Sequence, residues 1–334
     1  MAKIFITGVA GFLGSHLADI MLADGHTVAG TDNMIGGDYA NVPKDVVFYQ
    51  DDCNYFWNMK DAMEGCDIVY HCACTPYEGL SVFSPHVVMQ NLVTAATGVF
   101  SAACAAKVKR IVHCSSMARY GAQEPPFHED LMPMPQDPYG IGKFAVELLL
   151  ENLCNTHGVE WVVAVPHNII GPRQKYDDPF RNVASIMINL MLQGRQPVVY
   201  GDGNQERCFS FIDDCLFCLK KMAFQQNVIG SVVNIGPDEE VVTINQLAAT
   251  IATLLDFKLD PIYMPGRPQE VKHAVCSSDK ARRLLGYKTQ TPLVTGLARM
   301  IEHIKERGPK PFEYHLPIEI VSEKTPKTWT QQLF

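Results

Sequence analysis

A tyrosine and a lysine four positions apart, Tyr139 and Lys143, are the first residues whose spacing suggests chemistry. Pro138 is a typical first residue of a helix, and helix positions i and i+4 share one face. A free phenol has a pKa of about 10, but an ammonium about 4 Å away would stabilise the phenolate by roughly 4 kcal/mol. Before desolvation, which acts in the opposite direction, this attraction would lower the pKa by up to about three units, so the pair predicts a general base.

A serine that could serve the same site ends an apolar run in the stretch VHCSSMARYG. Ser116 would donate or relay a hydrogen bond to the substrate hydroxyl that Tyr139 deprotonates. The next two residues, Met117 and Ala118, carry no ionisable group, and Arg119 follows them. The pattern Y-x-x-x-K alone occurs on many surface helices, so the prediction depends on Ser116 and Tyr139 forming one site.

Three glycines, Gly8, Gly11 and Gly14, separate the first apolar run from an amphipathic segment in TGVAGFLGSH. Such glycines let a turn close, let the backbone approach a pyrophosphate and let helix and strand pack closely. Asp32 ends the second apolar run, eighteen residues past Gly14. An acid there accepts hydrogen bonds from both adenosine ribose hydroxyls and repels a 2′-phosphate, which predicts NAD rather than NADP. The alternative is a tight turn that binds nothing.

Strand-like and helix-like segments alternate through the first half of the chain. Apolar runs at 3–8, 26–32, 46–52, 67–73, 110–116 and 160–166 predict strands, and segments at 14–25, 56–63, 87–107 and 139–158 predict helices. This order predicts an α/β fold with a Rossmann-type doubly wound parallel sheet. Beyond residue 166 we expect a smaller, interleaved C-terminal lobe for the substrate. The NAD domain would be 1–166 with returns near 207–236, and the substrate lobe 167–206 and 237–334.

Composition narrows the class of protein. The chain has 334 residues, 47% of them hydrophobic, and a formal net charge of −8, which argues against a nucleic-acid partner. No secretory signal is apparent and no apolar run approaches the roughly 18 residues of a membrane span, so we expect a cytoplasmic protein without a membrane partner. The eleven cysteines predict reduced core thiols, and the lone C-x-x-C of Cys215 and Cys218 predicts no metal site.

Together these residues resemble the extended short-chain dehydrogenase/reductase family, specifically its nucleotide-sugar epimerases and dehydratases. The resemblance covers nearly the whole chain and includes blocks at 167–174, 200–214 and 266–287. Three positions depart from the usual pattern, since Val165, Cys208 and Ser277 stand where an arginine and two aspartates are common.

The resemblance implies a role for each matching residue. Tyr139 would be the base, Ser116 its partner and Lys143 the ligand of the cofactor ribose. The residues expected to contact NAD are Gly8, Gly11, Phe12, Leu13, Gly14, Asp32, Asn33, Asp52, Cys53, Ala73, Asn91, Tyr139, Lys143 and Pro166. Asp52 would equally suit a helix N-cap. The substrate would contact Ser116, Met117, Asn168, Arg207, Arg267 and Ala274, and the two arginines would hold its diphosphate.

The two residues after Ser116 indicate which reaction is favoured. In enzymes of this family, tyrosinate takes the sugar 4-hydroxyl proton while hydride passes from C4 to NAD. The dehydratases have Asp-Glu where this chain has Met117 and Ala118, the uronate decarboxylases have glutamate at the second position, and the 3,5-epimerases have cysteine. A 4-epimerase needs none of these groups, so epimerisation at C4 is favoured. A dehydratase, decarboxylase or oxidoreductase, and a non-catalytic NAD-binding protein, are the alternatives.

Two residues bear on the sugar. Ala274 resembles a gate position of UDP-hexose 4-epimerases, where a small residue admits acetamido sugars, so UDP-GlcNAc and UDP-GalNAc join UDP-Glc and UDP-Gal as expected substrates. Arg119 either pairs with a C6 carboxylate, which would make UDP-glucuronate the substrate, or points away from the pocket. The resemblance also implies a homodimer that pairs through the helices at 87–107 and 139–158, whose apolar faces would equally suit the core.

Overall fold

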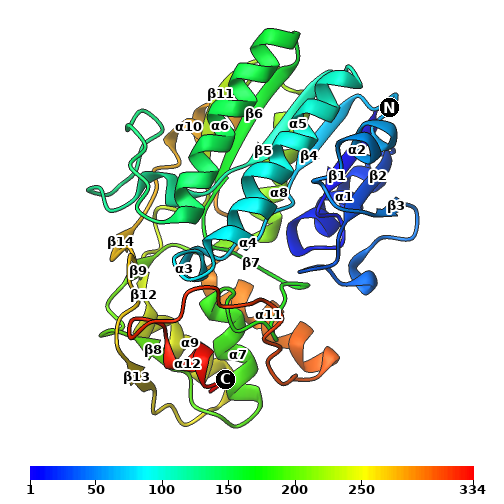
Figure 1. Ribbon diagram of the computed structural model, residues 1–334. Helices are drawn as coiled ribbons and strands as arrows, with labels where there is room; N and C mark the ends of the chain where they lie inside the picture. The colour runs from blue at the N-terminus through cyan, green and yellow to red at the C-terminus, as the bar shows by residue number, and fades with distance from the viewer.

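The computed structural model describes all 334 residues and is built around a seven-stranded parallel sheet. The strands lie in the order β11-β6-β5-β4-β1-β2-β3 (Figure 1). Their bounds are β1 Lys3–Thr7, β2 Thr27–Asp32, β3 Val47–Gln50, β4 Ile68–His71, β5 Arg110–Cys114, β6 Glu160–Pro166 and β11 Ser231–Ile235. The chain reverses direction across the sheet between β1 and β4, and ligands bind at the carboxyl ends of strands at such a point. The predicted Rossmann-type fold is confirmed.

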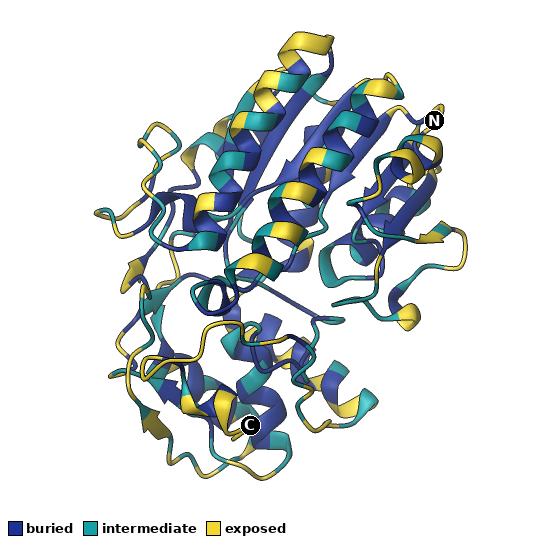
Figure 2. Cartoon of the chain, in the orientation of Figure 1, coloured by how far each residue is buried: buried dark blue, intermediate teal, exposed yellow.

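Helices cover both faces of the sheet because its strands are apolar on both sides. The bounds are α1 Phe12–Ala23 and α8 Ile212–Phe224 on one face, and α2 Phe56–Ala62, α5 Ala95–Ala105 and α6 Pro138–His157 on the other. The strands are almost wholly buried except for the exposed edge strand β3, and α5 and α6 expose their outer sides (Figure 2). The large lobe, meaning this sheet and its helices, therefore has a core on each side.

One continuous helical stretch, Pro85–Ala105, is long and apolar enough to cross a membrane by length and composition alone, with a mean hydropathy of 1.4. It consists of α4 Pro85–Met89, a π-helical turn Gln90–Thr94 and α5. No apolar run of this length was expected from the sequence. The stretch packs against α2 and α6 over the sheet, which is the position of a core helix.

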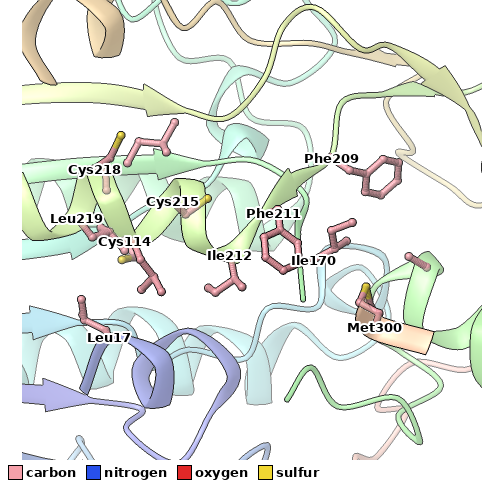
Figure 3. Close-up of a cluster of buried hydrophobic side chains, with 14 of the residues drawn as sticks. Leu17, Cys114, Ile170, Phe209, Phe211, Ile212, Cys215, Cys218, Leu219 and Met300 are labelled. Carbon is pink, nitrogen blue, oxygen red and sulfur yellow. The ribbon is translucent and has the colours of Figure 1, made fainter. Parts of the chain in front are cut away.

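The two cysteines of the C-x-x-C motif lie in the core between α8 and the sheet. Cys215 and Cys218 are both fully buried, and Figure 3 shows them on α8 with Leu219 and Ile212. All eleven cysteines are present as thiols. Helix α8 follows directly on the short strand β10 Ser210–Phe211 and begins at Ile212.

The small lobe is formed by three packed helices and short strand pairs. Its helices are α7 Val183–Leu192, α9 Ile244–Leu255 and α11 Leu293–Arg307. Strand β8 Val198–Tyr200 pairs with β13 Ile262–Met264, and β9 Glu206–Arg207 lies between β12 Val242–Thr243 and β14 His273–Ala274. The remaining elements are η1 Tyr39–Asn41, α3 Glu78–Ser81, η3 Met117–Tyr120, β7 Ile169–Ile170, α10 Asp279–Leu285 and α12 Lys327–Thr330. The boundary predicted between the two lobes stays a prediction.

The last segment, residues 309–334, runs along the junction of the lobes (red in Figure 1). The Glu319 carboxylate accepts the backbone N–H groups of His86 and Val87 at 2.9 Å each, at the start of α4. In the small lobe, the Trp329 indole donates to the Pro179 carbonyl at 3.3 Å. The segment is therefore bonded to both lobes.

Candidate active site

The turn between β1 and α1 has two positions at which only glycine fits. Gly8 has a φ of 73°, and a Cβ added at Gly14 would lie 2.2 Å from the Gly8 carbonyl oxygen. Helix α1 follows directly, with Gly11 as an N-cap that contributes no side chain. The first N–H groups of the helix therefore face the cleft without a capping side chain, and this cradle fits the pyrophosphate of a dinucleotide.

Two aspartates follow β2 and β3 beside this cradle. The Asp32 carboxylate accepts the N–H groups of Ala10 at 3.1 Å and Met34 at 2.8 Å, and burial raises its pKa. Asp52 accepts a hydrogen bond from the Asn33 side chain at 2.9 Å, while the N-cap of α2 is Tyr55. Asp52 is thus not a helix cap, and it faces the same cleft as Asp32.

A single cavity of about 450 Å³ lies between the two lobes. Every residue predicted to contact NAD lines it, as do four of the six residues predicted for the substrate. The cofactor set is Gly8, Gly11, Phe12, Leu13, Gly14, Asp32, Asn33, Asp52, Cys53, Ala73, Asn91, Tyr139, Lys143 and Pro166, and the substrate set is Ser116, Asn168, Arg207 and Arg267. The fold brings these residues, far apart in sequence, to one place.

The tyrosine, lysine and serine meet at the large-lobe wall of the cavity. Tyr139 lies in the first turn of α6, which Asp137 caps by accepting the Gly140 N–H at 2.9 Å. Lys143 donates to the Cys114 carbonyl at 2.8 Å, and its nitrogen is 5.7 Å from the centre of the Tyr139 ring. The Ser116 hydroxyl accepts the Ala118 N–H at 3.2 Å.

In the polypeptide by itself, desolvation outweighs the lowering of the tyrosine pKa that a nearby lysine was expected to give. Burial raises the pKa of Tyr139 well above its ordinary value, and Cys74 adds to this, while the Ser116 hydroxyl acts in the opposite direction. The lysine ammonium donates to the Cys114 carbonyl, and its nitrogen is 5.7 Å from the centre of the phenol ring. Desolvation of the phenolate therefore outweighs its attraction to Lys143.

Two arginines of the small lobe lie at the other end of the cavity. Arg207 donates to the carbonyls of Val271 at 2.7 Å and Lys272 at 3.2 Å. Arg267 forms an ion pair with Glu270 at 2.7 Å. Since both guanidinium groups line the cavity, they supply the positive charge that a diphosphate requires.

Comparison with known proteins identifies the family. Residues 4–236 match the model of the NAD dependent epimerase/dehydratase family. The protein belongs to this family. A UDP-glucose 4-epimerase from Mycolicibacterium smegmatis is 28% identical over 321 residues, covering 92% of this chain and 99% of that protein.

Two solved structures show the same fold. A UDP-glucose 4-epimerase from Thermotoga maritima with UDP-glucose has a TM-score of 0.87 at 26% identity, covering 91% of this chain and 99% of the other. A UDP-glucuronic acid 4-epimerase from Bacillus cereus, in complex with UDP-glucuronic acid and NAD, has a TM-score of 0.85 at 28% identity, covering 92% and 100%. The family is NAD-dependent, so the predicted cofactor is confirmed.

In this protein Arg119 lies behind the wall of the cavity and does not line it. Its guanidinium pairs with Glu147 of α6 at 2.9 Å, with both side chains 5–6% exposed, and donates to the Tyr120 hydroxyl at 3.2 Å. The Ser115 hydroxyl donates to the same Glu147 carboxylate. Arg119 therefore points away from the cavity, which was one of the two expectations for it.

Two residues predicted for the substrate lie outside the cavity. Ala274 is on β14 beside Arg207 of β9, is 5% exposed, and belongs to the apolar cluster that contains Tyr120 and Phe127. The predicted gate at Ala274 stays a prediction, which the packing of its methyl group in this apolar cluster does not support. Met117 lies against the side chain of Asn168 at 3.7 Å and does not line the cavity either.

Four charged residues that were not predicted from the sequence also line the cavity: Glu78, Asp137, Arg181 and Glu270. Arg181 extends from the small lobe to the loop after β2, where a Cβ on Gly36 would lie 2.8 Å from its guanidinium. Its charge lowers the pKa of Asp32. Arg181 lies in a loop and Glu78 begins the short helix α3, and neither belongs to a motif, so no sequence signal marked them.

Proposed function

We propose that the protein catalyses epimerisation at C4 of a UDP-activated hexose, UDP-glucose and UDP-galactose, through a transient 4-keto sugar. The observation that carries the proposal is that Tyr139, Ser116 and Lys143 line one cavity with the dinucleotide cradle and the arginines Arg207 and Arg267. The kinship with 4-epimerases supports the same reaction.

Each residue has a stated task in the proposed reaction. Tyr139 removes the proton from the C4 hydroxyl and returns it, and Ser116 hydrogen-bonds the same oxygen. Lys143, fixed by the Cys114 carbonyl, places a positive charge beside the phenol ring. The arginines hold the diphosphate while the sugar turns. NAD, when bound, accepts a hydride from C4 and returns it to the opposite face.

A neutral hexose is the sugar that the residues favour. The only side chain that suggested a uronate, Arg119, is occupied by Glu147 behind the cavity wall. With Ala274 in the core, no residue argues for the acetamido sugars. UDP-glucuronate and UDP-GlcNAc remain alternative substrates, because similar structures include a UDP-glucuronic acid 4-epimerase and a UDP-N-acetylglucosamine 4-epimerase.

The test is incubation of the purified protein with UDP-, GDP- and dTDP-hexoses, followed by NMR of the C4 configuration. We expect UDP-glucose and UDP-galactose to interconvert with no change of mass and no added NADH. Tyr139→Phe is expected to keep the bound NAD, released on denaturation, and to lose at least about a hundredfold in kcat. Full activity of Tyr139→Phe, or a mass loss of one water, would reject the proposal.

We further propose that the protein is a cytoplasmic homodimer. Two large apolar side chains on α6, Ile141 and Leu148, are 48% and 54% exposed and seven residues apart, so they share one face of the helix. The eleven thiols suit a reducing compartment. Light scattering of the wild type and of Leu148→Glu tests the dimer, because the variant is expected to be monomeric.

A further inference from the structure

Glu78 presents a carboxylate to the cavity, and no hydrogen bond or ion pair within the chain engages that carboxylate. Other acids in this region have partners, since Asp137 caps α6 and Glu270 pairs with Arg267. A half-buried carboxylate with no protein partner is available to whatever occupies the cavity.

The position of Glu78 relative to both ends of the cavity is fixed by its neighbours in α3. The Ser81 hydroxyl donates to the Glu78 carbonyl at 2.7 Å and to the Asp137 carboxylate at 3.3 Å. Asp137 caps the helix whose first turn carries Tyr139. The next residue, Gly79, has so little room that an added Cβ would lie 3.2 Å from the Arg267 guanidinium. Glu78 therefore lies between Tyr139 and Arg267.

The charges that face Glu78 come from every element around it. Burial raises its pKa to about 7, Asp137 adds to this, and Arg207 and Arg267 act in the opposite direction. Glu270 also raises the pKa of Glu78, and Glu78 in turn raises that of Tyr139. The carboxylate is therefore predominantly anionic above neutral pH.

We propose that Glu78 selects a neutral sugar and excludes one that carries a carboxylate at C6. The inference rests on the proposed function, in which the C4 hydroxyl meets Tyr139 and the diphosphate meets Arg207 and Arg267. The sugar then lies between these points, beside Glu78. A hydroxymethyl group at C6 can donate a hydrogen bond to a carboxylate, whereas a second carboxylate in the same confined space is repelled.

The experiment compares UDP-glucose with UDP-glucuronate on three proteins at pH 8.5. These are the wild type, Glu78→Gln and the control Glu151→Gln, whose carboxylate lies on the exposed side of α6. We expect the wild type and Glu151→Gln to prefer UDP-glucose. In Glu78→Gln, kcat/KM for UDP-glucuronate is expected to rise at least about tenfold relative to that for UDP-glucose, since one charge even about 10 Å away would have this effect at an effective dielectric of about 20, and the carboxylate is expected to be closer. Below pH 7 the preference of the wild type is expected to weaken, and that of Glu78→Gln to stay constant.

Dissociation constants of both UDP-sugars, measured on the same proteins, separate this inference from the proposed function. If no UDP-sugar is epimerised but the binding preference still changes in Glu78→Gln, the proposed function fails and the inference stands. An unchanged preference overturns the inference and leaves epimerisation intact. Loss of UDP-glucose turnover in Glu78→Gln, with binding and retained NAD unaltered, also overturns it, since Glu78 would then carry a proton.

Discussion

Removing Arg119 tests whether this residue serves the structure or the substrate. Arg119 and Glu147 form an ion pair at 2.9 Å with both side chains 5–6% exposed. The variant Arg119→Met keeps the apolar part of the side chain and leaves the Glu147 carboxylate with only the Ser115 hydroxyl. We therefore expect a loss of stability and no selective loss of activity on any sugar.

The magnitude follows from the burial of the pair. Breaking a buried ion pair by removing one partner costs about 3–5 kcal/mol, because a buried charge loses its compensation. Burial already raises the pKa of Glu147, and the Arg119 charge opposes this rise. Without Arg119 the folded-state pKa rises further above the unfolded value of about 4.3, so the cost is largest at high pH and shrinks as the pH falls toward 5.

Urea unfolding at pH 8 and pH 5, with a constant excess of NAD, measures both effects. Adding Glu147→Gln to Arg119→Met is expected to recover most of the lost free energy of unfolding, since no buried charge then remains. The matched control is Arg299→Met, which breaks an exposed pair with Asp213 and is expected to cost less than about 1 kcal/mol. The reasoning would be refuted by a cost below about 1 kcal/mol for Arg119→Met, together with a loss of turnover confined to UDP-glucuronate.

Three further outcomes are expected. His113 is buried, neither of its ring nitrogens is hydrogen-bonded, and burial lowers its pKa well below the ordinary value. Below about pH 6.5 only the unfolded chain then binds this proton, which destabilises the folded state by about 1.4 kcal/mol per pH unit. His113→Leu is expected to remove this destabilisation, measured by urea unfolding at pH 7.5 and 5.5. Gly14→Ala places a Cβ 2.2 Å from a backbone oxygen and is expected to abolish retained NAD, whereas Gly266→Ala, with its nearest atom at 3.9 Å, is expected to retain NAD. Arg181→Met removes a guanidinium beside the loop after β2, so the NAD content after gel filtration is expected to fall while the KM for UDP-glucose is unchanged; the reverse pattern would place Arg181 at the sugar.

The parts of the site that depend on neighbouring residues in sequence could be predicted. The spacing of Gly8, Gly11 and Gly14 is a property of one turn, and the i, i+4 relation of Tyr139 and Lys143 is a property of one helix. These residues line the cavity as predicted from the sequence. The strands could be predicted for the same reason, since continuous apolar runs form only where both faces are covered.

Long-range partners could not be predicted, because nothing in the spacing of residues specifies them. Arg119 finds its carboxylate 28 positions away on α6, in Glu147, which looked like one more polar residue of an amphipathic helix. The role expected for Ala274 assumed that the loop between Arg267 and Ala274 follows the path common in the family. In this chain that loop ends in β14, whose pairing with β9 buries the methyl group.

The position of Arg267 shows how the last segment, which carried no recognisable motif, contributes to the cavity. The Arg267 guanidinium lies 4.8 Å over the ring of Tyr200, and the Tyr200 hydroxyl is hydrogen-bonded to Thr328 of α12. The same segment is bonded to the start of α4 in the large lobe through Glu319. Because α4 begins shortly after α3, one stretch of chain links the lobe that carries Tyr139 and Glu78 to the arginine at the far end of the cavity. The distance between Tyr139 and Arg267 across the cavity therefore depends on packing that residues 309–334 supply.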